Sequence, residues 1–130
     1  MTKMQRNKGK RGEREFLNKL GELLNQDLSR NLNQSANGGA DCVDVNGFAI
    51  EIKRRESLSL GQWWKQATNQ ARTLNRQPAL AYRQSRKPWR IVVPLAAISP
   101  DLPADMQAEL SIQGFAVLVQ RVSLEREEAA

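Results

Sequence analysis

The dipeptide Asn46-Gly47 lies between two runs of alternating apolar and polar residues, and it constrains this 130-residue chain more than any other feature. Asn-Gly in that setting is the strongest short-range signal for a β-hairpin, because a type I′ turn needs positive φ at both central positions. Such a turn predicts three cross-strand pairs: Val45–Phe48, Asp44–Ala49 and Val43–Ile50. Side chains alternate along each strand, so the hairpin has an apolar face (Val43, Val45, Phe48, Ile50, Ile52) and a second face (Asp44, Ala49, Glu51, Lys53).

The second face of the hairpin carries two carboxylates, Asp44 and Glu51, and the ammonium group of Lys53. Hydrolysis of a phosphodiester with Mg²⁺ needs hard oxygen ligands for the ion and a cation beside the reacting phosphate, and this face supplies both. The alternative is an ordinary solvated strand face, on which Asp, Glu and Lys are common. The hairpin alone leaves both interpretations open.

Residues 13–26 show helical periodicity, with Phe16, Leu17, Leu20 and Leu24 on one stripe. Glu13 continues that stripe, whereas Glu15 belongs to the solvated side. A carboxylate that faces inward needs a partner, and a metal site or a polar cleft would provide one. Alternatively, Glu13 only complements the helix dipole in a frayed first turn.

The charge of the chain is positive and unevenly distributed. The net charge is +6, with an isoelectric point near 10.0. Between residues 53 and 90, ten Lys and Arg residues stand against one acid, Glu56, and the segment 82–90 interleaves Arg and Lys with Tyr82 and Trp89. This pattern indicates a protein that binds a phosphate backbone, although a solvated basic loop is the alternative.

A second helix is expected after the hairpin. Its inner positions are Trp63, Ala67, Gln70, Ala71 and Leu74, with Gln66 on the same side. A glutamine on this stripe could hydrogen-bond a metal-bound carboxylate, or it could satisfy a neighbouring backbone group. The sequence does not choose between these two roles, or between Gln66 and Gln70.

Several function classes are excluded by composition. The chain has no histidine, which excludes His-metal nucleases and Ser-His or Cys-His nucleophile systems. Cys42 is the single cysteine and is expected to be a small neutral neighbour opposite Glu51, so a zinc knuckle and an intramolecular disulfide are also excluded. There is no Walker loop, no signal peptide and no membrane-spanning stretch, so we expect a cytoplasmic protein without a nucleotide cofactor or a membrane partner.

The remaining sequence predicts one α/β domain over residues 1–130, with a basic N-terminal arm (1–10) and a frayed polar tail (125–130). Further strands are expected at 30–33, 79–82, 90–95 and 115–121, and a short helix within 100–113. The order of elements predicts a central mixed sheet flanked by helices.

Four motifs together resemble the PD-(D/E)xK nuclease superfamily, in the order seen in Holliday-junction resolvases of the archaeal type and in related phage-encoded endonucleases. They are the segment 8–14 (KGKRGER), Asp44-Val45, Glu51-Ile52-Lys53 and Gln66-Ala67. The resemblance covers about residues 8–94 and implies a restriction-endonuclease-like αβββαβ core. The family usually has Pro before the Asp, where this chain has Val43. Asp41 is a rival for the Asp position, but strand parity would place it on the apolar face, which favours Asp44.

The resemblance implies a role for each matching residue. Glu13, Asp44, Glu51 and the carbonyl of Ile52 would bind Mg²⁺, for which Mn²⁺ could substitute. Lys53 would orient the attacking water or stabilise charge on the phosphate, and Gln66 would support the site. The basic residues expected to contact DNA are Lys8, Lys10, Arg11, Arg14, Arg54, Arg55, Arg83, Arg86 and Lys87.

The function predicted on this basis is a metal-dependent endonuclease, most specifically a homodimeric Holliday-junction resolvase. Two alternatives remain: a nuclease of the same fold that acts on duplex or nicked DNA in restriction or repair, and a DNA-binding module without catalysis. Because one fold serves many activities, the choice between junction and other DNA rests on analogy.

Overall fold

The hairpin has the predicted register. The structure, a computed structural model, describes residues 3–28 and 42–129, and for residues 3–8, 126, 127 and 129 it describes the backbone alone. Strands β1 (Cys42–Val45) and β2 (Phe48–Arg54) are antiparallel, with all three expected pairs formed and Cys42 opposite Glu51, as predicted. Asn46 and Gly47 have φ values of 49° and 91°, which are the positive values that a type I′ turn requires.

The hairpin forms one side of a five-stranded mixed sheet with the order β1-β2-β3-β4-β5. β3 (Gln77–Arg83) is parallel to β2, whereas β4 (Arg90–Pro94) and β5 (Gln107–Ser111) are antiparallel to their neighbours. The parallel pair requires a crossover, and helix α3 (Leu60–Leu74) provides it. The predicted α/β class and the mixed central sheet are therefore confirmed, and the strands expected at 79–82 and 90–95 are present.

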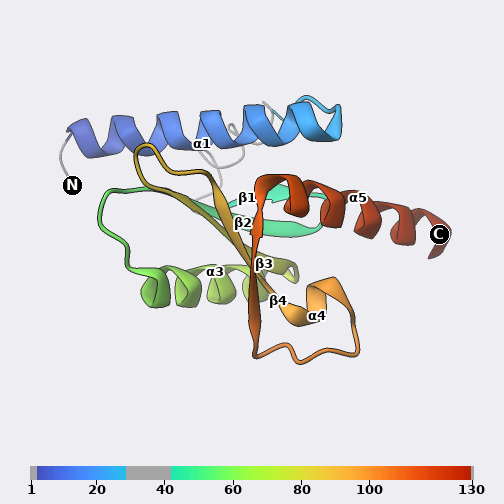
Figure 1. Cartoon of the computed structure of the whole chain (residues 1–130). Helices are drawn as coiled ribbons and strands as arrows, with labels where there is room; N and C mark the ends of the chain where they lie inside the picture. Colours follow the sequence, from blue (N-terminus) through green and yellow to red (C-terminus); the bar gives the residue numbers. More distant parts are fainter. Residues whose placement is uncertain (1–2, 29–41, 130) are drawn as a thin grey trace.

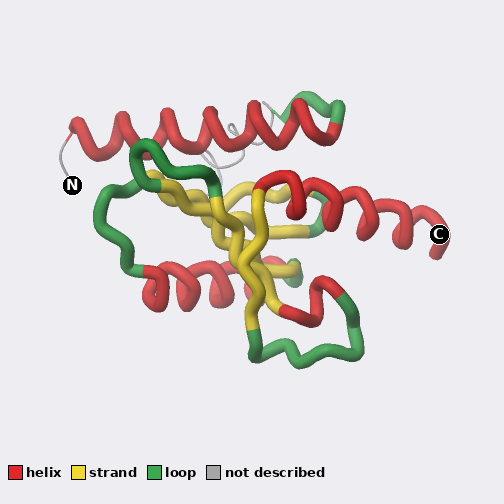
Figure 2. Tube along the Cα trace, in the orientation of Figure 1, coloured by secondary structure: helices red, strands yellow, loops and turns green. Residues whose placement is uncertain are grey.

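Helices cover both faces of the sheet (Figure 1). α1 (Lys3–Leu24) and α5 (Ile112–Ala129) lie on one face and α3 lies on the other, while the single-turn helix α4 (Leu95–Ile98) precedes β5. Figure 2 shows the same arrangement by element type. None of the helices among the described residues combines the length and apolar character needed to cross a membrane.

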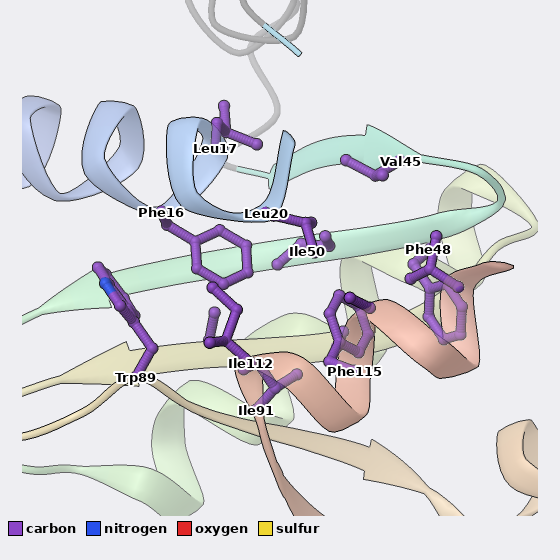
Figure 3. Close-up of a cluster of buried hydrophobic side chains, with 14 of the residues drawn as sticks. Phe16, Leu17, Leu20, Val45, Phe48, Ile50, Trp89, Ile91, Ile112 and Phe115 are labelled. Atoms are coloured by element: carbon purple, nitrogen blue, oxygen red, sulfur yellow. The ribbon is translucent and has the colours of Figure 1, made fainter. Parts of the chain in front are cut away.

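The main core lies between the sheet and the α1–α5 layer (Figure 3). Phe16 packs edge-on against Trp89 with ring centroids 5.1 Å apart, and Phe48 packs in the same way against Phe115 at 5.3 Å. The apolar face of the hairpin contributes Val43, Val45, Phe48 and Ile50 to this core. The opposite face of the sheet, which carries Glu51 and Lys53, is covered by α3 through a smaller cluster centred on Trp63 and Leu80.

The first helix begins ten residues earlier than predicted. α1 starts at Lys3, so the basic residues from 3 to 11 form its first turns. The Lys, Arg, Gln and Met residues of this segment favour helix, whereas Asn7, Gly9 and the following Gly12 oppose it. Gly12 has a packing role, because an ideal Cβ at this position would lie 2.5 Å from the Cβ of Arg54 on β2.

Two predictions for the C-terminal third were wrong. The segment within 100–113 that was expected to be helical contains β5, and the strand expected at 115–121 lies within α5. The run of apolar residues from 115 to 119 resembled a buried strand, but Ile112, Phe115, Ala116 and Val119 repeat at helical spacing and all four are buried. The backbone of α5 extends to Ala129, where a frayed tail was expected, and the strand expected at 30–33 lies outside the described residues.

The contact between Gly12 and Arg54 predicts opposite effects for the same substitution at two glycines. Gly12→Ala should lower the free energy of unfolding, because overpacking costs about 1–3 kcal/mol, more than the ~1 kcal/mol by which Ala exceeds Gly in helix propensity. The control is Gly61→Ala in α3, where nothing lies within 4 Å of the added Cβ, and which should be neutral or stabilising. Urea unfolding measures both, and equal stabilisation by both substitutions would show that α1 does not approach β2 this closely.

Candidate active site

The candidate site is built on the α3-facing side of β2, around Glu51 and Lys53. Glu51 pairs with Cys42 of β1 on one side and Leu80 of β3 on the other, and it is 2% exposed. Among the described residues, Glu51 is the one charged residue that is buried. Its Oε1 lies 3.2 Å from Nζ of Lys53, whose side chain is 19% exposed. A buried carboxylate is costly unless it is paired, and Lys53 provides the opposite charge from the same strand face.

This pair has a chemistry suited to phosphate. Glu51 is a fixed carboxylate beside a cation that solvent reaches, close to the point where β2 ends at Arg54. An anionic phosphate placed at that point would meet Lys53 first and the carboxylate behind it. Glu51 would also be a ligand for a divalent metal ion, which would polarise such a phosphate.

Asp44 has a different environment from the one expected of a metal ligand. Its Oδ1 accepts a hydrogen bond from the N–H of Gly47 at 3.3 Å, and its Oδ2 lies 3.1 Å from Nε of Arg76. Its strand partner is Ala49, and this pair lies two pairs nearer to the turn than the Cys42–Glu51 pair. Asp44 therefore stabilises the hairpin turn and ties it to the segment that follows α3. The rival Asp41 lies outside the described residues.

The described residues do not by themselves form a complete metal site. Within residues 3–28 and 42–129, no three Asp, Glu or Cys side chains are arranged so that they could hold an ion. Glu13 is half-buried on α1, directly after the glycine that packs against Arg54. Glu13 thus lies one residue beyond the point where α1 meets the end of β2, on the side of the sheet opposite α3.

The glutamine that faces the sheet is Gln70. The side chain of Gln66 is exposed, whereas Oε1 of Gln70 is buried and accepts no hydrogen bond within the described part of the chain. Ala67 and Ala71, on either side of Gln70 along the helix face, are both buried against the sheet. Because a buried amide oxygen without a partner is costly, Gln70 fits a supporting role better than Gln66 does.

A second polar group on the same sheet face escaped the sequence analysis. Tyr82 pairs with Lys53 across β2 and β3, and its hydroxyl donates to Oε1 of Glu109 on β5 at 2.5 Å. Nε of Arg90 lies 3.1 Å from the same oxygen. Burial raises the pKa of Tyr82 to about 12, and the hydrogen bond to Glu109 adds to the shift, while Arg90 opposes it. The alternation of β5 would have placed Glu109 here, had that segment been predicted as a strand.

The predicted DNA-binding residues divide into two groups. Arg54 pairs with Glu56 and Arg83 pairs with Glu15, while Arg55 donates to the backbone carbonyl of Arg54. The structure therefore uses these three arginines in contacts within the protein. The second group is exposed and makes no ion pair among the described residues: Lys10, Arg11, Arg14, Arg86 and Lys87. The side chain of Lys8 lies outside the described part.

Comparison with known proteins adds independent information. A family model described as phage putative PDDEXK endonuclease matches residues 4–125. The solved structure of Hjc, a Holliday junction resolvase from the archaeal hyperthermophile Archaeoglobus fulgidus, is 20% identical and has a TM-score of 0.46, with 86% of this chain and 98% of that chain covered. No curated protein sequence matches the chain.

The environment of Tyr82 predicts an unusual titration that can be observed directly, because the chain has a single tyrosine. The tyrosinate absorbance band should appear with a midpoint near 12 rather than 10.0. Glu109→Gln should move the midpoint down but not to 10.0, since burial is the larger cause. A raised folded-state pKa contributes stability that is present below pH 10 and lost as the pH rises towards 12, so Tyr82→Phe should remove that pH dependence. A midpoint of 10.0 in the folded protein would mean that the hydroxyl is neither buried nor held by Glu109.

Proposed function

Because the chain belongs to the phage putative PDDEXK endonuclease family, we propose that it hydrolyses DNA phosphodiester bonds with the help of a divalent metal ion. The observation that carries this proposal is the buried Glu51 carboxylate, held 3.2 Å from Lys53 on β2, the second strand of the hairpin. A protein that only binds DNA gains nothing from a buried carboxylate beside the cation that meets the phosphate. This speaks against the non-catalytic alternative.

The proposed roles are those that the resemblance of the motifs implies, and the burial of Glu51 beside Lys53 supports them. Glu51 would hold the metal ion together with Glu13, one aspartate and the carbonyl of Ile52. Lys53 orients the attacking water or stabilises charge on the phosphate. Mg²⁺ suits a carboxylate site that keeps several waters, and Mn²⁺ could replace it. Gln70, rather than Gln66, supports the site from α3.

The aspartate of this site is either Asp44 or Asp41. Asp44 lies on the correct face, but its two oxygens are engaged by Gly47 and Arg76. Asp44 is the first candidate because of its position in the motif. Since both of its oxygens already have partners within the protein, the test must also include substitution of Asp41.

We propose a four-way junction as the preferred substrate and a homodimer as the active form, since two symmetric cuts need two paired sites. Both statements rest on the resemblance of the motifs. The competing substrate is duplex or nicked DNA, for which the same chemistry would serve. Cleavage of a labelled junction beside linear duplex distinguishes the two substrates.

The chemistry predicts that Glu51→Gln and Lys53→Met each reduce metal-dependent cleavage by at least about a hundredfold, the size of effect seen when one charged catalytic group is removed. DNA binding should persist, because the exposed cations outside this pair supply most of the contacts with the phosphate backbone. Glu22→Gln and Lys19→Met, on the exposed side of α1, are matched controls and should cleave normally. Cleavage that survives EDTA, or that survives both site substitutions, would contradict the proposal.

A second pair of substitutions assigns the aspartate. If Asp44 is a ligand, Asp44→Asn should abolish cleavage even well below the melting temperature of the variant. If Asp44 only braces the turn, Asp44→Asn should lower stability by about 1 kcal/mol, typical of a lost hydrogen bond or cap, while cleavage persists below the new melting temperature. Asp41→Asn, measured in parallel, would then be the inactive variant. Normal cleavage by both would remove the aspartate from the proposed site.

A further inference from the structure

The loop between β3 and β4 has a backbone that favours glycine but carries an arginine. The N–H of Lys87 donates to the carbonyl of Gln84 at 3.2 Å, which closes a turn over residues 84–87. Arg86, the third residue of this turn, has a φ of 64°. Gly or Asn is preferred at such a position, because other side chains meet a steric penalty there. The loop therefore carries an arginine at a backbone position where a side chain with a Cβ is sterically unfavourable.

One side of this loop is fixed to the segment that follows β2. The carboxylate of Glu56 accepts hydrogen bonds from the backbone N–H of Ser85 at 3.3 Å and from its hydroxyl, and the backbone carbonyl of Glu56 accepts one from Gln84 at 2.7 Å. Arg54 joins the same group, because its guanidinium lies 3.0 Å from both Glu56 and Ser85. The one acid between residues 53 and 90 is thus used to hold this loop.

The other side of the loop is fixed to α1. Oε1 of Glu15 lies 2.7 Å from Nη1 of Arg83 and 3.0 Å from Nε1 of Trp89, so one carboxylate holds both ends of the loop. Nε of Arg83 also donates to the backbone carbonyl of Lys87 at 2.7 Å. These contacts join four segments: α1, the β2–α3 connection and the ends of β3 and β4.

The tip of the loop is left as two exposed cations. Arg86 and Lys87 are exposed, and neither forms an ion pair within the described residues. The loop lies at the end of the sheet where Arg54 pairs with Arg83 and Lys53 pairs with Tyr82. In Figure 1 the loop rises towards the N-terminal half of α1, at the same end as the β2–α3 connection. The tip therefore lies at the same end of the sheet as Lys53, which is near the end of β2.

We propose that residues 84–88 form a preorganised phosphate-binding loop, in which Glu15 and Glu56 fix the backbone and Arg86 and Lys87 contact the DNA backbone beside the Glu51–Lys53 site. This inference rests on the proposed function, and it assigns different roles to the basic residues of this region. Arg54 and Arg83 position the loop, whereas Arg86 and Lys87 bind. Because the loop is already ordered, binding does not require it to lose conformational freedom.

The test is Arg86→Gly, which relieves the backbone and removes the charge. The melting temperature should stay equal or rise, while the affinity for a fluorescein-labelled four-way junction in EDTA falls about tenfold, as for a lost charge-assisted contact. The slope of log K against log salt should become shallower by about 0.9. Lys87→Ala, as a single substitution, should make the slope shallower by a similar amount. Arg86→Asn, which is uncharged but tolerates this φ, should behave as Arg86→Gly does.

The matched control is Arg72→Ala, which removes one exposed charge from the end of α3 that leads to the start of β3, at the far end of the sheet. Arg72→Ala should leave the slope unchanged. If it changes the slope as much as Arg86→Gly does, the effect comes from net charge alone and the inference is overturned. Unchanged binding by Arg86→Gly, or no binding by the parent protein, would also overturn it. Binding and cleavage are read separately: absence of cleavage with the predicted binding losses would refute the endonuclease and leave the loop assignment intact.

Discussion

Burial of the Glu51 carboxylate is the constraint on which the site and much of the fold depend. A carboxylate that is 2% exposed must keep an opposite charge close to it, and Lys53 lies two residues further along the same strand. That spacing works only if β2 is fully extended and its register is fixed, because a slip of one residue would turn both side chains into the main core. The type I′ turn at Asn46-Gly47 fixes the register on one side, and the parallel pairing with β3 fixes it on the other.

The features of the fold that depend on local chemistry could be predicted from the sequence. The register of the hairpin, the apolar face and the position of Cys42 opposite Glu51 all follow from one turn and the alternation of side chains. The start of α1 was missed because Gly9 and Gly12 suggest a break, and the reason for Gly12 is the close approach of Arg54 from a strand 42 positions later. The error in α5 has a similar origin, since a short apolar run does not distinguish a buried strand from a buried helix face.

The site was predictable in part for the same reason. Glu51 and Lys53 belong to one strand, so their proximity is a local property. The partners of Arg83 and Tyr82 come from other elements, and no periodicity in the sequence indicates them. Glu15 illustrates the difference: helical spacing placed it on the solvated side of α1, yet the β3–β4 loop lies there and binds its carboxylate.

These contacts change what the net charge of +6 means for DNA binding. Arg76, Arg83 and Arg90 each pair with an acid from another element. Partly exposed pairs of this kind add little stability individually, so their effect is to fix geometry and to lower the local positive potential. Among the predicted DNA-binding residues, those left exposed without an ion pair in the described part of the chain lie on α1 between Lys10 and Arg14 and at the tip of the β3–β4 loop, and Glu15 links these two elements. Glu15 and Glu56 therefore have a double effect at the end of the sheet where Lys53 and Glu51 lie: they neutralise Arg83 and Arg54, and they hold the loop whose tip keeps two exposed cations.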